Sequence, residues 1–218
     1  WHEAQFALWN RSNLLDRTLG WYEKAEPIAR QIAQRQGFDG VRWMKMTDPS
    51  GTEAPSKVGS FLIWQQPHLI YLAELLYRAD PTKEVLEKYN RLVQETAEFM
   101  YSFATYDELE GRYVLKGAIP AQETLRAAET VNPPFELSYW HFAMQTAQQW
   151  RERMGQQRSL EWDEMIDKLS PLASNKEGLY LAAETATDTY KDIRYTSDHM
   201  PVLGAVGILP MNKLIRED

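Results

Sequence analysis

The chain has 218 residues, of which 44% are hydrophobic and 25% charged, an ordinary composition for a globular protein with one sizeable core. The net charge of −7, with no basic stripe, argues against a nucleic-acid partner. No apolar stretch approaches the roughly 20 residues of a membrane span, so we expect a soluble protein without a membrane partner, and the absence of cysteine excludes disulfides and thiolate chemistry.

The spacing of apolar residues predicts seven helices along the chain. They cover residues 3–19, 22–36, 62–79, 83–104, 135–154, 160–169 and 199–209. The first, third, fifth and seventh are apolar on several sides or rich in small and aromatic residues, so we expect them to be inner helices. The second, fourth and sixth have one apolar face, so we expect them to be outer helices.

The predicted connections alternate in length. Short links cover residues 20–21, 80–82 and 155–159, and long links cover residues 37–61, 105–134 and 170–198. Short links join antiparallel neighbours, whereas long loops are uncommon unless they serve a function. The pattern predicts an all-α toroid of helical hairpins, with a site on the long loops that precede the inner helices. An irregular helical bundle is the alternative.

A toroid of six hairpins would need twelve helices, and seven are predicted here. We therefore expect residues 1–218 to be a single partial (α/α) toroid domain, roughly half to two-thirds of a barrel. The first residue is Trp1 rather than Met, which also suggests a piece of a longer chain whose remaining hairpins would be its partner.

The first long loop contains polar and aromatic residues suited to sugars. Arg42, Trp43 and Lys45 lie within it, and Gln65, Gln66 and His68 follow near the start of the third helix. Amide, imidazole and indole groups hydrogen-bond hydroxyls and stack on sugar rings without adding net charge. The segment also fits an ordinary helix start, because Pro67 suits a first turn and His68 suits a core position.

The second and third long loops carry the remaining candidates. A β-hairpin through residues 112–115 is predicted. Glu123 follows an apolar stretch that could raise its pKa and suit a general acid, but composition alone favours a solvated glutamate. Near the seventh helix, Ser197 or Asp198 suits either a helix cap or a sugar contact. His2, His68, His141 and His199 lack tight metal spacing, and no nucleotide-binding motif is present, so no metal or cofactor is expected.

Five segments, in this order, resemble the six-hairpin glycosidases, nearest to the branch related to glycoside hydrolase family 65. They are residues 1–6, 40–46, 63–68, 119–123 and 195–199. The resemblance implies an (α/α)6 catalytic barrel and a glycoside hydrolase that inverts the anomeric carbon. Inversion by hydrolysis also needs a second carboxylate, roughly 6.5–9.5 Å from the acid. The sequence does not identify that base, which in related barrels can lie on a late hairpin.

Individual positions carry specific implications of this resemblance. Residues 120–123 look like the family's Gly-Pro-Asp-Glu-Tyr stretch, which makes Glu123 the implied general acid, and Asn132 looks like the asparagine that follows. Trp1 and His2 look like a Trp-Asp pair that grips the sugar in subsite −1, with His in place of Asp. Residues 195–198 look like a Lys-Gln pair ahead of an Asp in the phosphorylases, but keep only Asp198. These departures leave the sugar, and the choice between hydrolysis and phosphorolysis, open.

The loop composition and the resemblance together imply a carbohydrate substrate contacted by side chains from several segments. These are Trp1, His2, Arg42, Trp43, Lys45, Gln65, Gln66, His68, Gln122, Tyr195 and Asp198. One alternative is a non-catalytic carbohydrate-binding or scaffold piece. Another is a lyase or epimerase on the same toroid, with Tyr195 and His199 as proton-transfer groups.

Overall fold

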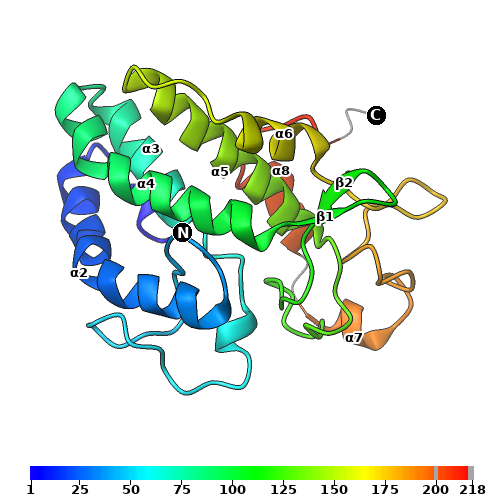
Figure 1. Cartoon of the computed structure of the whole chain (residues 1–218). Helices are drawn as coiled ribbons and strands as arrows, with labels where there is room; N and C mark the ends of the chain where they lie inside the picture. The colour runs from blue at the N-terminus through cyan, green and yellow to red at the C-terminus, as the bar shows by residue number, and fades with distance from the viewer. Residues whose placement is uncertain (199–200, 216–218) are drawn as a thin grey trace. The chain divides into compact units, whose positions relative to one another are not determined.

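The computed structural model describes residues 1–198 and 201–215, and this part of the chain is mostly helical (Figure 1). The longer helices are α2 (Ser12–Gln36), α3 (His68–Ala79), α4 (Lys83–Phe103), α5 (Pro134–Arg153) and α6 (Leu160–Lys168). The short helices are α1 (Ala4–Leu8), η1 (Gly59–Phe61), α7 (Ile193–Thr196), η2 (Pro201–Leu203) and α8 (Gly204–Gly207). The predicted helical class is confirmed. None of the described helices is long and apolar enough to cross a membrane.

The chain divides into two compact units, each built from three segments. The first unit consists of Trp1–Ala54, Gln65–Ser102 and Ala143–Asp163. The second consists of Pro55–Trp64, Phe103–Phe142 and the described part of Glu164–Asp218. The boundary at Phe142 and Ala143 falls inside α5, so the first half of this helix belongs to the second unit and its second half to the first unit.

The predicted break between the first two helices is wrong in position. The chain turns at Asn10, whose φ of 54° is a left-handed conformation that asparagine tolerates better than most residues. Gly20 lies inside α2, which runs without interruption from Ser12 to Gln36. Leu15, Leu19 and later residues of α2 form one buried stripe, and its burial outweighs the roughly 1 kcal/mol that a helical glycine costs.

The third helix begins at His68 rather than at the predicted residue 62, because the preceding glutamines bind backbone groups of another segment. Gln66 accepts the N–H of Trp43 at 2.8 Å and donates to the carbonyl of Val41 at 2.8 Å. Gln65 donates to the carbonyl of Trp43 at 2.9 Å. These bonds hold residues 41–43 in an extended path beside the start of α3.

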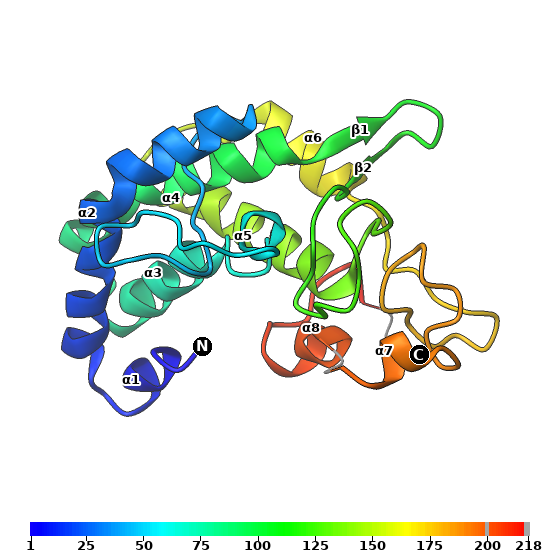
Figure 2. The same ribbon diagram turned by 90° about the horizontal axis from the view of Figure 1, so that it is seen from below.

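The fourth helix was predicted at residues 83–104 and is observed at Lys83–Phe103. In Figures 1 and 2, α2 and α3 lie side by side in the first unit. Arg30 of α2 bonds Glu95 of α4 at 2.9 Å. Gly40 passes close to α4 with a φ of 69°, and a Cβ there would lie 2.2 Å from the carbonyl oxygen of Glu95. Only glycine fits this crossing.

A buried carboxylate joins α3 to the second half of α5 within the first unit. Glu74 is 2% exposed, and its Oε2 lies 2.6 Å from Nη1 of Arg153. Arg78, one turn along α3, donates from Nε to Oε1 of Glu74 at 2.8 Å. Hydrogen bonds from both arginines lower the pKa of Glu74 against the opposing effect of burial, which is the largest single influence.

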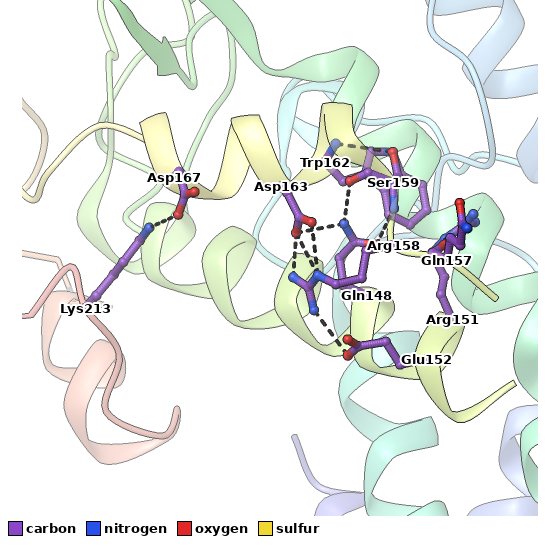
Figure 3. Close-up of polar contacts among 10 residues, drawn as sticks. All are labelled: Gln148, Arg151, Glu152, Gln157, Arg158, Ser159, Trp162, Asp163, Asp167 and Lys213. Atoms are coloured by element: carbon purple, nitrogen blue, oxygen red, sulfur yellow. Dashed lines mark hydrogen bonds and ion pairs between the residues drawn. The ribbon is translucent and has the colours of Figure 1, made fainter. Parts of the chain in front are cut away.

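The turn between α5 and α6 is closed by the polar cluster drawn in Figure 3. Nε of Arg158 donates to both carboxylate oxygens of Asp163, at 3.1 and 3.0 Å. Gln148 accepts the N–H of Ser159 at 3.0 Å and donates to the Ser159 carbonyl at 2.7 Å. The predicted short link at residues 155–159 is confirmed, and α6 begins at Leu160.

The second unit contains the predicted hairpin, formed by β1 (Thr105–Asp107) and β2 (Arg112–Val114). Two loops, one after β2 and one after α6, lie side by side in this unit (Figure 2). Glu184 donates its N–H to the carbonyl of Val131 at 2.9 Å, and Thr185 donates to the carbonyl of Glu129 at 2.6 Å.

The predicted seventh helix at residues 199–209 is wrong in form. Residues 199–200, and therefore the candidate His199, lie outside the described part of the chain. The following residues form only the short elements η2 and α8. Glycines at 204 and 207 favour this outcome because glycine weakens a helix by roughly 1 kcal/mol at each position.

Candidate functional site

The loop that carries Glu123 is held at four points within the second unit. Ile119 donates its N–H to the carbonyl of Phe61 at 2.8 Å. Ala121 donates its N–H to Oε1 of Glu136 at 2.7 Å. Gln122 and Thr124 provide the other two attachments, both to the segment at residues 195–198. The backbone is therefore fixed on both sides of Glu123, whose own side chain is exposed.

The attachments to residues 195–198 bring together candidates that lie far apart in the sequence. Gln122 is 1% exposed, and its Nε2 donates to the carbonyl of Tyr195 at 3.0 Å across 73 residues. Asp198 accepts the N–H of Thr124 on Oδ2 at 3.1 Å. Four predicted site residues, Gln122, Glu123, Tyr195 and Asp198, therefore belong to one locality. Asp198 bonds this loop. Its alternative role as a helix cap concerns residues 199–200, which lie outside the described part of the chain.

A small apolar cluster supports this locality. Leu125 packs with Ala182, Ala183 and Ala186, and the half-buried ring of Tyr195 packs against the same cluster. This packing gives Tyr195 a structural role. Its alternative role in proton transfer stays a prediction.

A hydrogen-bond network behind the loop sets the path of the chain into α5. Asn132 has a φ of 51°, accepts the N–H of Leu115 at 2.9 Å, and donates to Oε2 of Glu184 at 2.7 Å. Arg112 of β2 forms a two-pronged pair with Glu184, at 2.9 and 2.8 Å. The hydrogen bond from Arg112 is the main cause that lowers the pKa of Glu184. The network keeps Glu184 ionised and connects three segments around Asn132.

Glu136 is a residue of this locality that sequence reasoning missed. It lies in the first turn of α5, where acidic residues are common because they favour the positive end of the helix dipole. Such residues are usually exposed, but Glu136 is 0% exposed. Burial raises the pKa of Glu136 to about 7, opposed by the N–H groups of Ala121 and of Glu136 itself. The sequence contains no signal that separates it from an ordinary helix-start glutamate.

The other predicted contacts lie in the first unit, and most of them are buried among protein groups. Arg42 is 2% exposed, with Nη1 3.2 Å from Oε1 of Gln66 and its guanidinium 5.3 Å from the ring centre of Phe99. Trp43 donates to Thr96 at 2.8 Å. Gln65 and Gln66 make the backbone bonds described above. Their predicted contacts with sugar stay predictions, and the contacts observed here are structural.

Four further candidates of the first unit are exposed or partly exposed. Trp1 stacks edge-on with His68, with ring centres 4.7 Å apart. Desolvation lowers the pKa of His68 to about 3, so this ring is neutral at physiological pH. His2 and Lys45 are exposed.

A pocket of about 620 Å³ lies in the second unit and is lined mainly by residues 174–179 and 187–191, including Leu179 and Tyr190. Glu123 does not line it. Across the described residues, no group of three or more His, Asp or Glu side chains is placed to hold a metal ion.

Comparisons with known proteins identify a solved structure of similar fold. No family model matches the chain, and no curated protein matches its sequence. The chain is similar to a solved structure described as "Putative kojibiose phosphorylase from human microbiome", with a TM-score of 0.60 and 13% sequence identity. The match covers 78% of this chain and 27% of that chain. At this identity the likeness concerns the fold alone.

Proposed function

We propose that the chain is part of an (α/α)6 toroid that cleaves a glycosidic bond with inversion, and that Glu123 is its general acid. The observation that carries the proposal is the meeting of two segments singled out separately in the sequence. Residues 119–125 and 195–198 are joined by the Gln122 to Tyr195 and Thr124 to Asp198 hydrogen bonds, and they leave Glu123 exposed. The likeness to the phosphorylase-described structure supports the same class of enzyme.

In the proposed reaction, the carboxylic acid of Glu123 donates its proton to the glycosidic oxygen as the bond from that oxygen to the anomeric carbon breaks. A water oxygen bonds to the opposite face of the same carbon and loses a proton to a base. If inorganic phosphate replaces water, its oxygen forms the new bond and the product is a sugar 1-phosphate. The chain spans 27% of the matched structure, so residues elsewhere in the full-length protein can supply the base.

The test uses the full-length protein and the variant Glu123→Gln. The matched control is Glu129→Gln, an exposed glutamate of the same loop that pairs only loosely with Arg126, at 3.6 Å. Activity is measured on a panel of α-linked glucose disaccharides, with and without inorganic phosphate, and the anomeric configuration of the product is followed by NMR. Loss of a general acid lowers the rate about 10²–10⁴-fold, whereas the control keeps the wild-type rate.

The outcomes separate the possible functions. A sugar 1-phosphate that forms only when phosphate is present indicates phosphorolysis, and a reducing sugar formed without phosphate indicates hydrolysis. Calorimetry that shows sugar binding without turnover indicates a non-catalytic binding domain. Equal rates for wild type and Glu123→Gln would rule out Glu123 as the acid.

A further inference from the structure

The buried carboxyl group of Glu136 is unusual in its contacts. Its Oε1 accepts the N–H of Ala121 at 2.7 Å, and Ala121 lies two residues before Glu123. Its Oε2 is buried and has no hydrogen-bond partner among the residues that the structure describes. The neighbouring Pro120 has no N–H to donate, so the N–H of Ala121 is the first backbone donor after Pro120 on the stretch that leads to Glu123.

The structural needs of this position do not explain a glutamate. A buried carboxyl group with one unsatisfied oxygen destabilises the fold, because the desolvation of that oxygen is not repaid. A glutamine would accept the same N–H without a charge, and a leucine would fill a similar space without polar atoms. No charged side chain in the described part of the chain contributes to the pKa of Glu136, so it does not neutralise a buried cation.

We propose that Glu136 is a positioning residue for Glu123: its carboxyl group holds the Ala121 N–H and so fixes the backbone from which the general acid reaches the glycosidic oxygen. This inference rests on the proposed function of Glu123. Glu136 is fully buried and bonds the loop at Ala121, so its effect on the reaction passes through the loop. A general acid is sensitive to such support, because a displacement of about 1 Å can lower a rate about 100-fold.

The ionisation of Glu136 makes the strength of its hydrogen bond to Ala121 depend on pH, which a side chain that does not titrate would not do. A carboxylate accepts a shorter and stronger hydrogen bond than a neutral carboxylic acid. Since burial raises the pKa of Glu136 to about 7, the hold on Ala121 strengthens as the pH rises through neutrality. The groups acting on this carboxyl are the N–H of Ala121 and that of Glu136 itself.

The experiment compares Glu136→Leu and Glu136→Gln in the full-length protein. Ser138→Ala is the matched control, because Ser138 is also 0% exposed in α5 and its Oγ has no hydrogen-bond partner in the described chain. Each protein is assayed on a disaccharide, whose leaving group needs protonation, and on the corresponding 2,4-dinitrophenyl glycoside, whose leaving group does not. The proposal expects Glu136→Leu to lower kcat for the disaccharide about 100-fold while kcat for the activated substrate and both KM values stay near wild type.

In the variant Glu136→Gln the side-chain carbonyl oxygen still accepts the N–H of Ala121, and the variant is expected to fold. It is expected to retain most of its disaccharide activity and to lose the step near pH 7 from the wild-type pH profile. Equal loss on both substrates for Glu136→Leu, or an unchanged pH profile for Glu136→Gln, would overturn the positioning role. The two proposals fail separately. Full activity of Glu123→Gln removes the proposed function, whereas an inactive Glu123→Gln beside a fully active Glu136→Leu removes only this inference.

Discussion

The substitution Glu136→Gln should change how the stability of the protein depends on pH, whatever the protein catalyses. The pKa of Glu136 rises from 4.5 to about 7 on folding, because burial disfavours its charged form. At 1.36 kcal/mol per pH unit, this rise corresponds to about 3 kcal/mol. Because folding raises the pKa of this acid, the contribution of protonated Glu136 to the free energy of unfolding is fully present below pH 4.5. That contribution is lost as the pH rises through 7. Wild type should therefore lose about 3 kcal/mol relative to Glu136→Gln across this range.

Urea unfolding at a series of pH values between 4.5 and 8 measures this difference. Tryptophan fluorescence is a suitable signal because Trp140, one turn along α5, is fully buried in the second unit. The titrations of other groups are common to both proteins and cancel in the difference between them. Ser138→Ala should follow the pH dependence of wild type. Parallel stability curves for wild type and Glu136→Gln would show that Glu136 has an ordinary pKa in the folded state, and the reasoning from its burial would be refuted.

Three further substitutions test features of the fold, each by urea unfolding. Gly40→Ala should destabilise the protein by at least about 2 kcal/mol, since its Cβ would lie 2.2 Å from the carbonyl of Glu95 at a φ of 69°; a wild-type midpoint would contradict this crossing. Glu74→Leu should cost about 3 kcal/mol because it leaves Arg153 without its buried partner, and a loss in the double variant with Arg153→Leu equal to the sum of the two single losses would show that the pair is not coupled. Asn132→Ala should be about 1 kcal/mol less stable than Asn132→Gly, because both lose the same hydrogen bonds but only alanine is strained at a φ of 51°; the opposite order would refute this account.

The longer elements were predictable because their patterns are local. The apolar face of α4 predicted its bounds to within one residue, and the strand-like residues 112–115 predicted the short strand β2 in the same way. The break at Asn10 and the continuity through Gly20 were not predictable in this way. They depend on which turn adopts a left-handed conformation and on a buried stripe along α2, and both are set by packing.

The candidate site was predictable as residues but not as an arrangement. Glu123 and Asp198 were identified from resemblance, and the two hydrogen bonds that join their segments connect residues separated in the sequence by α5 and α6. Glu136 was not identified at all. Burial of a helix-start glutamate depends on loops that fold over it, and Ala121 reaches it from another part of the chain.

The path of α5 through both compact units has a consequence for how the protein can be divided. Each unit is assembled from three separate stretches of sequence, and the boundary near residues 142–143 cuts a hydrogen-bonded helix. No single N-terminal or C-terminal truncation therefore releases one unit intact. A cut within α5 at the unit boundary would divide the helix between the two products without separating the units. A split-protein or domain-swap design would have to place its junctions in exposed loop residues such as 55–57, where the chain has no helix or strand.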